Sequence, residues 1–324
     1  MTTKNLVVFG AVAVVLGATA YFLNGGAKSS APKLNGKAVV PGLDASAVAK
    51  IEIGTKLALS AGDKGWTVAS LNGYPADRVK IVENLLKLHD LKVGQVVRGK
   101  KLESTTPVVL KDAAGKELAK LELGPKHEKW GHGRYAKFGG EAVLVSDSLD
   151  AFEGDAKQWC NTRIASIPSA DVKAVSYKHG KELVELEKGT NSTWVLKGLT
   201  AKEELDTSKT YSLDSALSYL DFNSVADPKL TEAELGFSTG YVYTVTYKDG
   251  SNTVKRVATV GNTVKGGTDR YFKMDNGNWI FTISSYSAEN MMKTRKDLVK
   301  AKPEPEPKKE EPKKTEPKKP QAKK

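Results

Sequence analysis

Residues 48–68, VAKIEIGTKLALSAGDKGWTV, decide the fold predicted for this chain. Apolar residues alternate with polar ones in the first half of the stretch, which is the period of a strand with one buried face. A turn that contains Gly62 then separates a second such run from Gly65-Trp66-Thr67-Val68. Because a Gly-bearing turn between two alternating runs is typical of a β-hairpin, the stretch predicts antiparallel strands.

A second copy of this pattern lies at residues 172–196, VKAVSYKHGKELVELEKGTNSTWVL. It repeats the order of strand, hairpin and tryptophan, and the similarity extends until residues 45–165 correspond to residues 170–300. Such self-similarity predicts two units of one architecture, and a chance alignment of short amphipathic strands is the alternative. The positions expected to play the same structural part in the two copies are Trp66 and Trp194, Arg134 and Arg270, and Tyr135 and Tyr271.

Helices are predicted in two places in each copy. One follows the hairpin, where apolar residues recur at helical spacing, and a short one closes each copy, over residues 147–159 and 286–298. Strands with helices set apart from them predict the α+β class, with an antiparallel sheet in each of two domains, 38–165 and 166–300. The residues expected to form the apolar faces of the longer helices are Val79, Val82, Leu85, Leu86 and His89 in the first copy, and Leu213, Ala216, Leu217 and Leu220 in the second.

Residues 6–23, LVVFGAVAVVLGATAYFL, form an 18-residue stretch without a charge. Such a stretch is just long enough to cross the hydrocarbon core of a bilayer as a helix. It predicts a single transmembrane signal anchor within residues 1–37, in the inner membrane, with the body outside the cytoplasm in the periplasm. Cleavage after Ala20 with secretion of the body, and a buried helix, are the alternatives. The residues expected to anchor the chain are Leu6, Phe9, Val14, Leu16, Tyr21 and Leu23.

Charge is concentrated towards the C-terminus. The 324-residue chain has a formal net charge of +12, and residues 301–324 contribute +4 of it through nine lysines against five glutamates. This segment also holds six prolines and no apolar residue beyond alanine, so it is predicted to be a disordered basic tail. A basic segment favours polyanions, and peptidoglycan or another cell-wall polyanion is the partner expected for it. Nucleic acid is not expected as a partner, because no motif that reads RNA or DNA accompanies the charge.

One segment invites a metal-binding interpretation. His127 and His132 flank Glu128, but their spacing would place them about 140° apart on a helix, whereas zinc-protease histidines share one helix face. Because Gly131 also breaks a helix, a surface loop is expected, and a weak metal site in that loop is the alternative. The single cysteine, Cys160, is expected to be a packed and inert thiol. The sequence predicts no catalytic residue, no cofactor and no metal, and therefore a protein that is not an enzyme.

The order of these features resembles the bacterial family known as DUF4340, a domain of unknown function. The resemblance covers residues 40–300 and rests on the apolar stretch, a strand of the Val48-x-x-Ile51-x-Ile53 type, the strand that opens with Trp66, and the helix start Pro75-Ala76-Asp77. Members of that family are usually single-span or secreted envelope proteins, and many are encoded beside ABC-2 type permeases and the auxiliary proteins of gliding-motility-type ABC transporters. The resemblance implies a non-catalytic accessory subunit that binds an ABC permease, its ATPase or auxiliary proteins. A structural envelope protein that holds a wall polyanion is the alternative.

Overall fold

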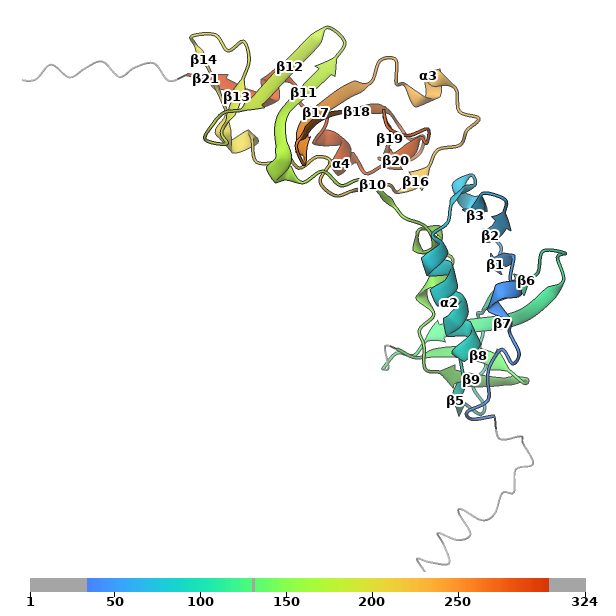
Figure 1. The fold of residues 1–324 in the computed structure, drawn as a ribbon. Helices are drawn as coiled ribbons and strands as arrows, with labels where there is room; N and C mark the ends of the chain where they lie inside the picture. Colours follow the sequence, from blue (N-terminus) through green and yellow to red (C-terminus); the bar gives the residue numbers. More distant parts are fainter. Residues whose placement is uncertain (1–33, 130–131, 303–324) are drawn as a thin grey trace, which may run out of the picture. The chain divides into compact units, whose positions relative to one another are not determined.

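The computed structural model describes residues 34–129 and 132–302 (Figure 1). Of these residues, 40% lie in strands and 17% in helices. Contacts divide the chain into two compact units. Unit 1 contains the residues up to Trp66 together with Arg78–Gln158, and unit 2 contains Thr67–Asp77 together with the residues from Trp159 onward.

The first sheet has nine antiparallel strands in the order β4-β3-β2-β1-β6-β7-β8-β9-β5. Its strands and the helix that interrupts them are β1 (Lys50–Ile53), β2 (Leu57–Gly62), β3 (Gly65–Val68), β4 (Tyr74–Pro75), α2 (Arg78–Asp90), β5 (Val93–Val96), β6 (Thr106–Lys111), β7 (Glu117–Lys126), β8 (Arg134–Phe138) and β9 (Glu141–Val145).

Strand β1 shows why the alternating pattern folds as it does. Its inward residues Ile51 and Ile53 are completely buried and lie opposite Leu59 and Leu57 of β2. Its outward residue Glu52 pairs with lysines on the other face of the sheet. Alternation of this kind buries one face of a strand and leaves the other in water, so the apolar ladder fixes the register.

The main sheet of unit 2 has eight antiparallel strands in the order β13-β12-β11-β17-β18-β19-β20-β16. The eight strands β3-β2-β1-β6-β7-β8-β9-β5 of the first sheet stand in the same sequential order, so the two sheets share one topology. The described chain adds two small sheets, β10-β15 and β14-β21.

The bounds of the remaining strands and helices are β10 (Arg163–Ala165), β11 (Val172–His179), β12 (Glu182–Lys188), β13 (Trp194–Leu196), β14 (Glu203–Leu205), β15 (Leu220–Asp221), β16 (Ser224–Val225), α3 (Glu232–Leu235), β17 (Tyr241–Asp249), β18 (Asn252–Thr263), β19 (Arg270–Met274), β20 (Phe281–Ile283), α4 (Ser285–Glu289), α5 (Arg295–Leu298) and β21 (Val299–Ala301).

The segment Thr67–Asp77 belongs to unit 2 although it precedes helix α2 of unit 1. Asn72, in a left-handed conformation with φ 55°, donates hydrogen bonds from Nδ2 to the carbonyl oxygens of Val225 and Ala226, each at 3.1 Å. The ring of Tyr74 contacts three aromatic rings of the same unit edge-on, namely those of Phe222, Trp279 and Phe281. The repeat pattern of the sequence gives no sign of this exchange.

The predicted fold class is wrong. In place of α+β units behind a membrane-spanning helix, the described chain forms two units made mainly of strands. The longest described helix, α2, has 13 residues, and no helix within residues 34–129 and 132–302 is long and apolar enough to cross a membrane. Residues 6–23, which contain all of the expected anchor residues, and most of the basic tail lie outside the described residues.

Three of the four predicted helices differ from the structure. Residues 211–218 form successive turns in place of a helix, although Leu213 and Leu217 are buried as expected of an apolar face. Hydroxyls there bond nearby carbonyls, as Ser215 does with Ser212, and such bonds compete with helix formation. The segment 147–159 forms two 3-10 helices separated by Gly154, and 286–298 divides into α4 and α5, since Thr294 caps a new helix.

Candidate functional site

The paired arginines of the repeat stand beside the same kind of strand irregularity. Arg134 begins β8 and lies opposite Lys126 of β7, just after a shift in the register of that pair. Arg270 begins β19 and lies opposite Thr263 of β18, again just after a register shift. A bulge of this kind kinks one strand and re-aims the side chains beside it. The two side chains therefore start from equivalent positions of the two sheets.

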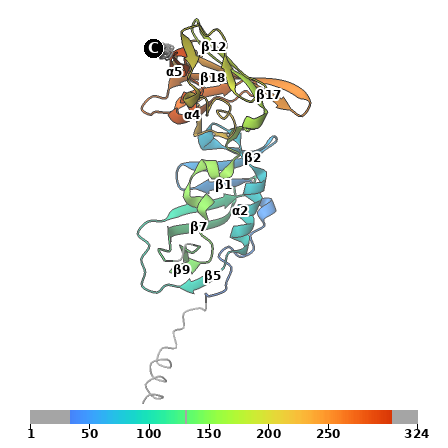
Figure 2. The ribbon, with the colours of Figure 1, turned by 90° about the vertical axis from the view of Figure 1, so that its left-hand side faces the viewer.

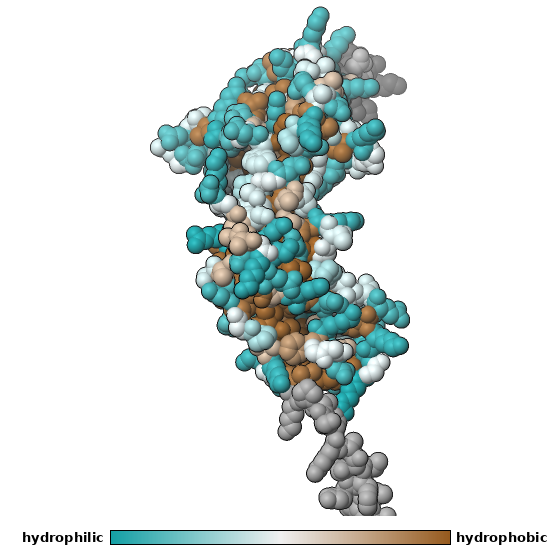
Figure 3. All heavy atoms as spheres, turned by 90° about the vertical axis from the view of Figure 1, so that its right-hand side faces the viewer, coloured by the Kyte–Doolittle hydropathy of each residue, from teal (hydrophilic) through white to brown (hydrophobic). Residues whose placement is uncertain are grey.

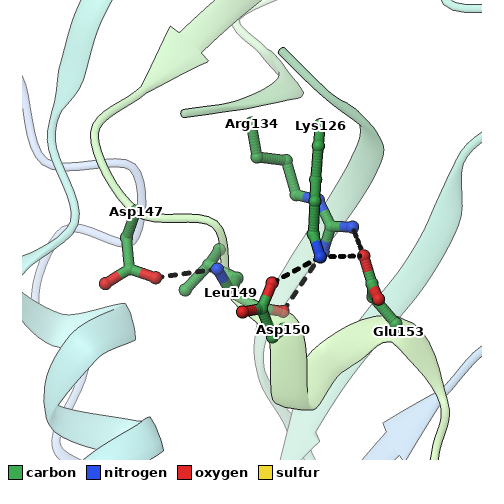
Figure 4. A network of polar contacts seen from close by, with 6 residues as sticks. All are labelled: Lys126, Arg134, Asp147, Leu149, Asp150 and Glu153. Carbon is green, nitrogen blue, oxygen red and sulfur yellow. Dashed lines mark hydrogen bonds and ion pairs between the residues drawn. The ribbon is translucent and has the colours of Figure 1, made fainter. Parts of the chain in front are cut away.

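In unit 1 the bulge supports a network of charged groups (Figure 4). Arg134 is only 5% exposed, and it donates from Nη1 to the carbonyl oxygen of Leu149 at 3.1 Å and from Nη2 to the carboxylate of Glu153. The ammonium of Lys126 lies 2.7 Å from Asp150 Oδ1 and 3.2 Å from Glu153 Oε1. Strands β7 and β8 thus supply two cations, and the 3-10 helix Asp150–Glu153 supplies two carboxylates.

The turn that presents these carboxylates is itself held by a local hydrogen bond. Asp147 Oδ1 accepts from the backbone N–H of Leu149 at 2.7 Å, and Leu149 adopts a left-handed conformation with φ 50° (Figure 4). The hydrogen bond from Lys126 lowers the pKa of the Asp150 carboxyl, and the two acids raise the pKa of Lys126. These shifts favour the ionised forms of Asp150 and Lys126 at neutral pH.

Arg270 makes different contacts in unit 2. Its Nε donates to the carbonyl oxygen of Gly261 at 2.9 Å, and its Nη1 donates to the hydroxyl of Thr263 at 3.2 Å. In unit 1 the guanidinium turns to Leu149 and Glu153 instead, and Arg134 Nε is buried without a hydrogen-bond partner among the described residues. A buried donor without a partner is rare in native proteins and calls for an explanation.

A cavity of about 610 Å³ lies beside Arg134. Its wall is formed by the 100–106 loop, the bulged end of β7, and the side chains of Arg134 and Glu153. The ammonium of Lys100 lies 4.3 Å from the centre of the Tyr135 ring, and the neighbouring Lys101 is exposed. The lining combines three cations with hydroxyls and two carboxylates, which suits the binding of a polar ligand.

A different kind of surface lies on helix α2, which runs beside the strands of the first sheet (Figure 1, Figure 2). Ile81, Leu85 and Leu88 face the core of unit 1 and are buried. Val79, Val82 and Leu86 repeat at i, i+3 and i+7 on the other side of the helix and are 64%, 47% and 49% exposed. We call these three residues the outer stripe. Figure 3 shows apolar side chains gathered on one face of unit 1.

A groove of about 370 Å³ adjoins the outer stripe. It reaches from Val82 and Leu86 of α2 across to Val48 and Trp66, so the first tryptophan of the repeat lines this groove. Its counterpart Trp194 begins β13 and lies under the ammonium of Lys188, 5.3 Å from the ring centre. The two tryptophans therefore occupy matching strands but have different surroundings.

A family model described as "Domain of unknown function (DUF4340)" matches residues 66–238, from the strand that holds Trp66 to the residues after α3. The chain belongs to this family. The family predicted from the sequence is thus confirmed. No curated protein and no solved structure matches the chain. The matched region of this DUF4340 protein includes α2 and its outer stripe, and also the Arg134 network.

The histidines of this DUF4340 protein lie where a loop was expected, after the end of β7. The backbone N–H of His127 donates to Gly133 at 2.8 Å, and its ring lies 5.6 Å from that of Tyr135. The part of the chain that the structure describes holds no group of three or more His, Cys, Asp or Glu side chains placed to bind a metal ion. Cys160 is buried and is not part of a disulfide bond.

Sequence reasoning missed the partners of Arg134 and the side of α2 that faces outward. Glu153 and Lys126 are part of no motif recognised in the sequence, and they meet Arg134 only in the folded chain, where β7 pairs with β8. For α2, the face proposed from the sequence combined Val79, Val82 and Leu86, which are exposed, with the buried Leu85. A second apolar stripe at Ile81, Leu85 and Leu88 was a signal present in the sequence that could have separated the two sides.

Proposed function

We propose that this DUF4340 protein is a non-catalytic binding subunit of an ABC-type transport complex, with its body outside the cytoplasm, and that the outer stripe of α2 is where a protein partner docks. The observation that carries the proposal is the exposure of Val79, Val82 and Leu86 beside an apolar groove. Surface apolar residues that occur singly need no explanation, but a contiguous apolar surface beside a groove is typical of an interaction site.

The spacing of the outer stripe favours a particular kind of partner. Residues at i, i+3 and i+7 form a straight seam on a helix, and such a seam pairs with the apolar face of another helix or with a matching groove. Around the seam stand Arg78, Glu83 and Lys87, so charged groups border it on the surface. This arrangement of an apolar strip with a charged rim suits a protein partner better than a small molecule.

The assignment to a transport complex rests on the family. Many DUF4340 proteins are encoded beside ABC-2 type permeases, as the sequence resemblance implies, and the uncharged stretch 6–23 is consistent with export of the body. The network around Arg134 supports a binding role over catalysis, because its two carboxylates and the ammonium of Lys126 are all engaged in ion pairs.

The experiment that tests this proposal is co-purification from the native host. The full-length tagged protein is expected to retain an ABC permease and its ATPase after mild solubilisation, identified by mass spectrometry. The double variant Val82→Gln and Leu86→Gln should lose most of both. Glutamine keeps the helix propensity of α2 and both positions are exposed, so the fold should persist.

The matched control is Leu183→Gln, which changes an apolar residue of β12 that is 56% exposed and belongs to unit 2. It should retain the permease and the ATPase. If the wild-type protein retains neither component, the transport role is wrong. If the stripe variant and the control retain them equally, the complex is formed elsewhere and α2 is not the docking site.

A second function is favoured by the lysine-rich segment 301–324, which suits attachment to a wall polyanion. Binding of the full-length protein to purified peptidoglycan should then fall with added salt and disappear when residues 303–324 are removed. A deletion variant that binds as well as the full chain would contradict this alternative.

A further inference from the structure

The arginine beside the cavity, Arg134, makes different hydrogen bonds from its counterpart in unit 2, Arg270. Where Arg270 uses its Nε to bond the carbonyl oxygen of Gly261, Arg134 leaves the same donor without a partner and turns its other nitrogens to Leu149 and Glu153. The two arginines stand at equivalent positions of the same strand topology but bond different groups. Arg134 therefore does not bond the bulged strand beside it as Arg270 does. Its side chain instead forms part of a cavity wall.

The charges of the cavity lining favour an anion. The lining residues with a charge are Lys100, Lys101, Arg134, Glu103 and Glu153, three cations against two acids. Glu153 is neutralised by Arg134 and Lys126, and these two cations with Glu153 and Asp150 form a balanced set of four. The two lysines of the loop then face a single carboxylate, Glu103, which leaves an excess of one positive charge on that side of the cavity.

Both loop lysines are exposed. The ammonium of Lys100 rests on the Tyr135 ring at 4.3 Å, and Lys101 is exposed with no acidic partner among the described residues. Ser104 and Thr106 add hydroxyls to the same wall. The volume of about 610 Å³ lies within the range of small-molecule sites.

We infer that the cavity beside Arg134 binds the phosphate group of a small molecule, with Lys101 and Lys100 supplying ammonium groups from the loop and the guanidinium of Arg134 supplying positive charge from the sheet. Arginine and lysine are the usual protein partners of phosphate oxygens, since charge-assisted hydrogen bonds to them are short and strong. A lining that offers two ammonium groups and a guanidinium favours a dianion over a single carboxylate. This binding role is independent of docking at α2.

The test is isothermal titration calorimetry, in which inorganic phosphate is added to the full-length protein at low ionic strength. Saturable binding is expected, and Lys101→Gln should weaken it by roughly tenfold, the loss of one charge-assisted contact. The matched control is Lys64→Gln, which removes an exposed lysine of the β2–β3 turn of the same sheet and lowers the net charge equally. It should leave the affinity unchanged.

Competition distinguishes the ligand classes. Glycerol phosphate that binds more tightly than inorganic phosphate would identify a phosphate ester as the ligand, and equal or weaker binding would identify the free ion; either result supports the site. Acetate that competes as well as phosphate would overturn the phosphate assignment.

Arg134→Lys and Arg270→Lys provide a further comparison in the two units. Only the first should reduce phosphate binding, and thermal melting would report whether each variant is folded. Absence of saturable binding at millimolar phosphate, or equal affinity in the Lys101 and Lys64 variants, would overturn the inference.

Discussion

Glu203 shows how strongly a single side chain can be tied to its surroundings in this protein. Its carboxylate accepts from Arg295 Nη2 at 2.7 Å and from the backbone N–H of Thr200 at 2.9 Å. These bonds, that of Arg295 first, lower the pKa of Glu203 to about 2. Because Arg295 also donates to the carbonyl oxygen of Gly198, one guanidinium ties the start of α5 to the loop before β14.

This shift predicts a dependence of stability on pH. A carboxyl whose folded pKa lies below its unfolded value of about 4.3 stabilises the fold above that value and loses its contribution as the pH falls towards the folded pKa. The Glu203 contribution should therefore be complete at pH 7 and fall between about pH 5 and pH 2. Glu203→Gln, which cannot ionise, should lose less stability than the wild type between pH 7 and pH 3 in urea unfolding.

Glu141→Gln serves as the control for the loss of one carboxylate, since Glu141 is an exposed residue of β9 in unit 1. Its stability should follow the wild-type pH dependence. A Glu203→Gln variant whose acid sensitivity equals that of the wild type would show that the ion pair with Arg295 does not contribute to stability.

Helix α2 carries two apolar stripes, and adjacent residues on it have opposite environments. Leu85 is 3% exposed and packs into unit 1, whereas Leu86 is 49% exposed on the outer stripe. Removing a buried leucine side chain costs the transfer free energy of its methyl groups and leaves a cavity, whereas an exposed one has little packing to lose. The stability of the unit and the proposed docking surface therefore depend on different residues of the same helix.

Alanine substitutions should separate these two parts of α2. Leu85→Ala is expected to lower the free energy of unfolding by about 2–5 kcal/mol, and Leu86→Ala should change it by less than about 0.5 kcal/mol. Chemical unfolding followed by circular dichroism measures both. Equal destabilisation by the two variants would mean that Leu86 is part of the core and does not belong to an exposed surface.

The sequence was most informative about strands and least informative about helices. In β1 and β11, period-2 alternation is set by the pleat itself, so the buried positions Ile51, Ile53, Val175 and Tyr177 could be located without knowing the fold. The short helices within 147–159 could not be predicted in this way, because Gly154 and the local turns determine whether the segment forms an α-helix or 3-10 helices. The Arg134 network could not be predicted from the sequence, since Glu153 meets Arg134 only after β7 and β8 are paired.

At the scale of the whole chain, a short segment of the first half completes the second unit. The boundary predicted from the sequence followed the repeat, but contacts assign Thr67–Asp77 to unit 2. Sequence similarity between the copies carries no information about such an exchange, because the aromatic contacts of Tyr74 are made with residues 222, 279 and 281, more than a hundred positions away. A fragment that begins after residue 158 would lack this segment.

Tyr74→Ala should therefore destabilise unit 2, although Tyr74 lies in the first quarter of the sequence. Its ring makes edge-on contacts with Phe222 and Trp279 at 5.1 Å and with Phe281 at 5.9 Å, and each such aromatic pair contributes roughly 0.5–1.5 kcal/mol beyond burial. Hydrogen exchange measured by mass spectrometry should quicken in β15, β16 and β20 and stay unchanged in β6–β9. Faster exchange confined to unit 1 would mean that the segment Thr67–Asp77 supports its neighbours in sequence, and the division of the chain into these two units would then be wrong.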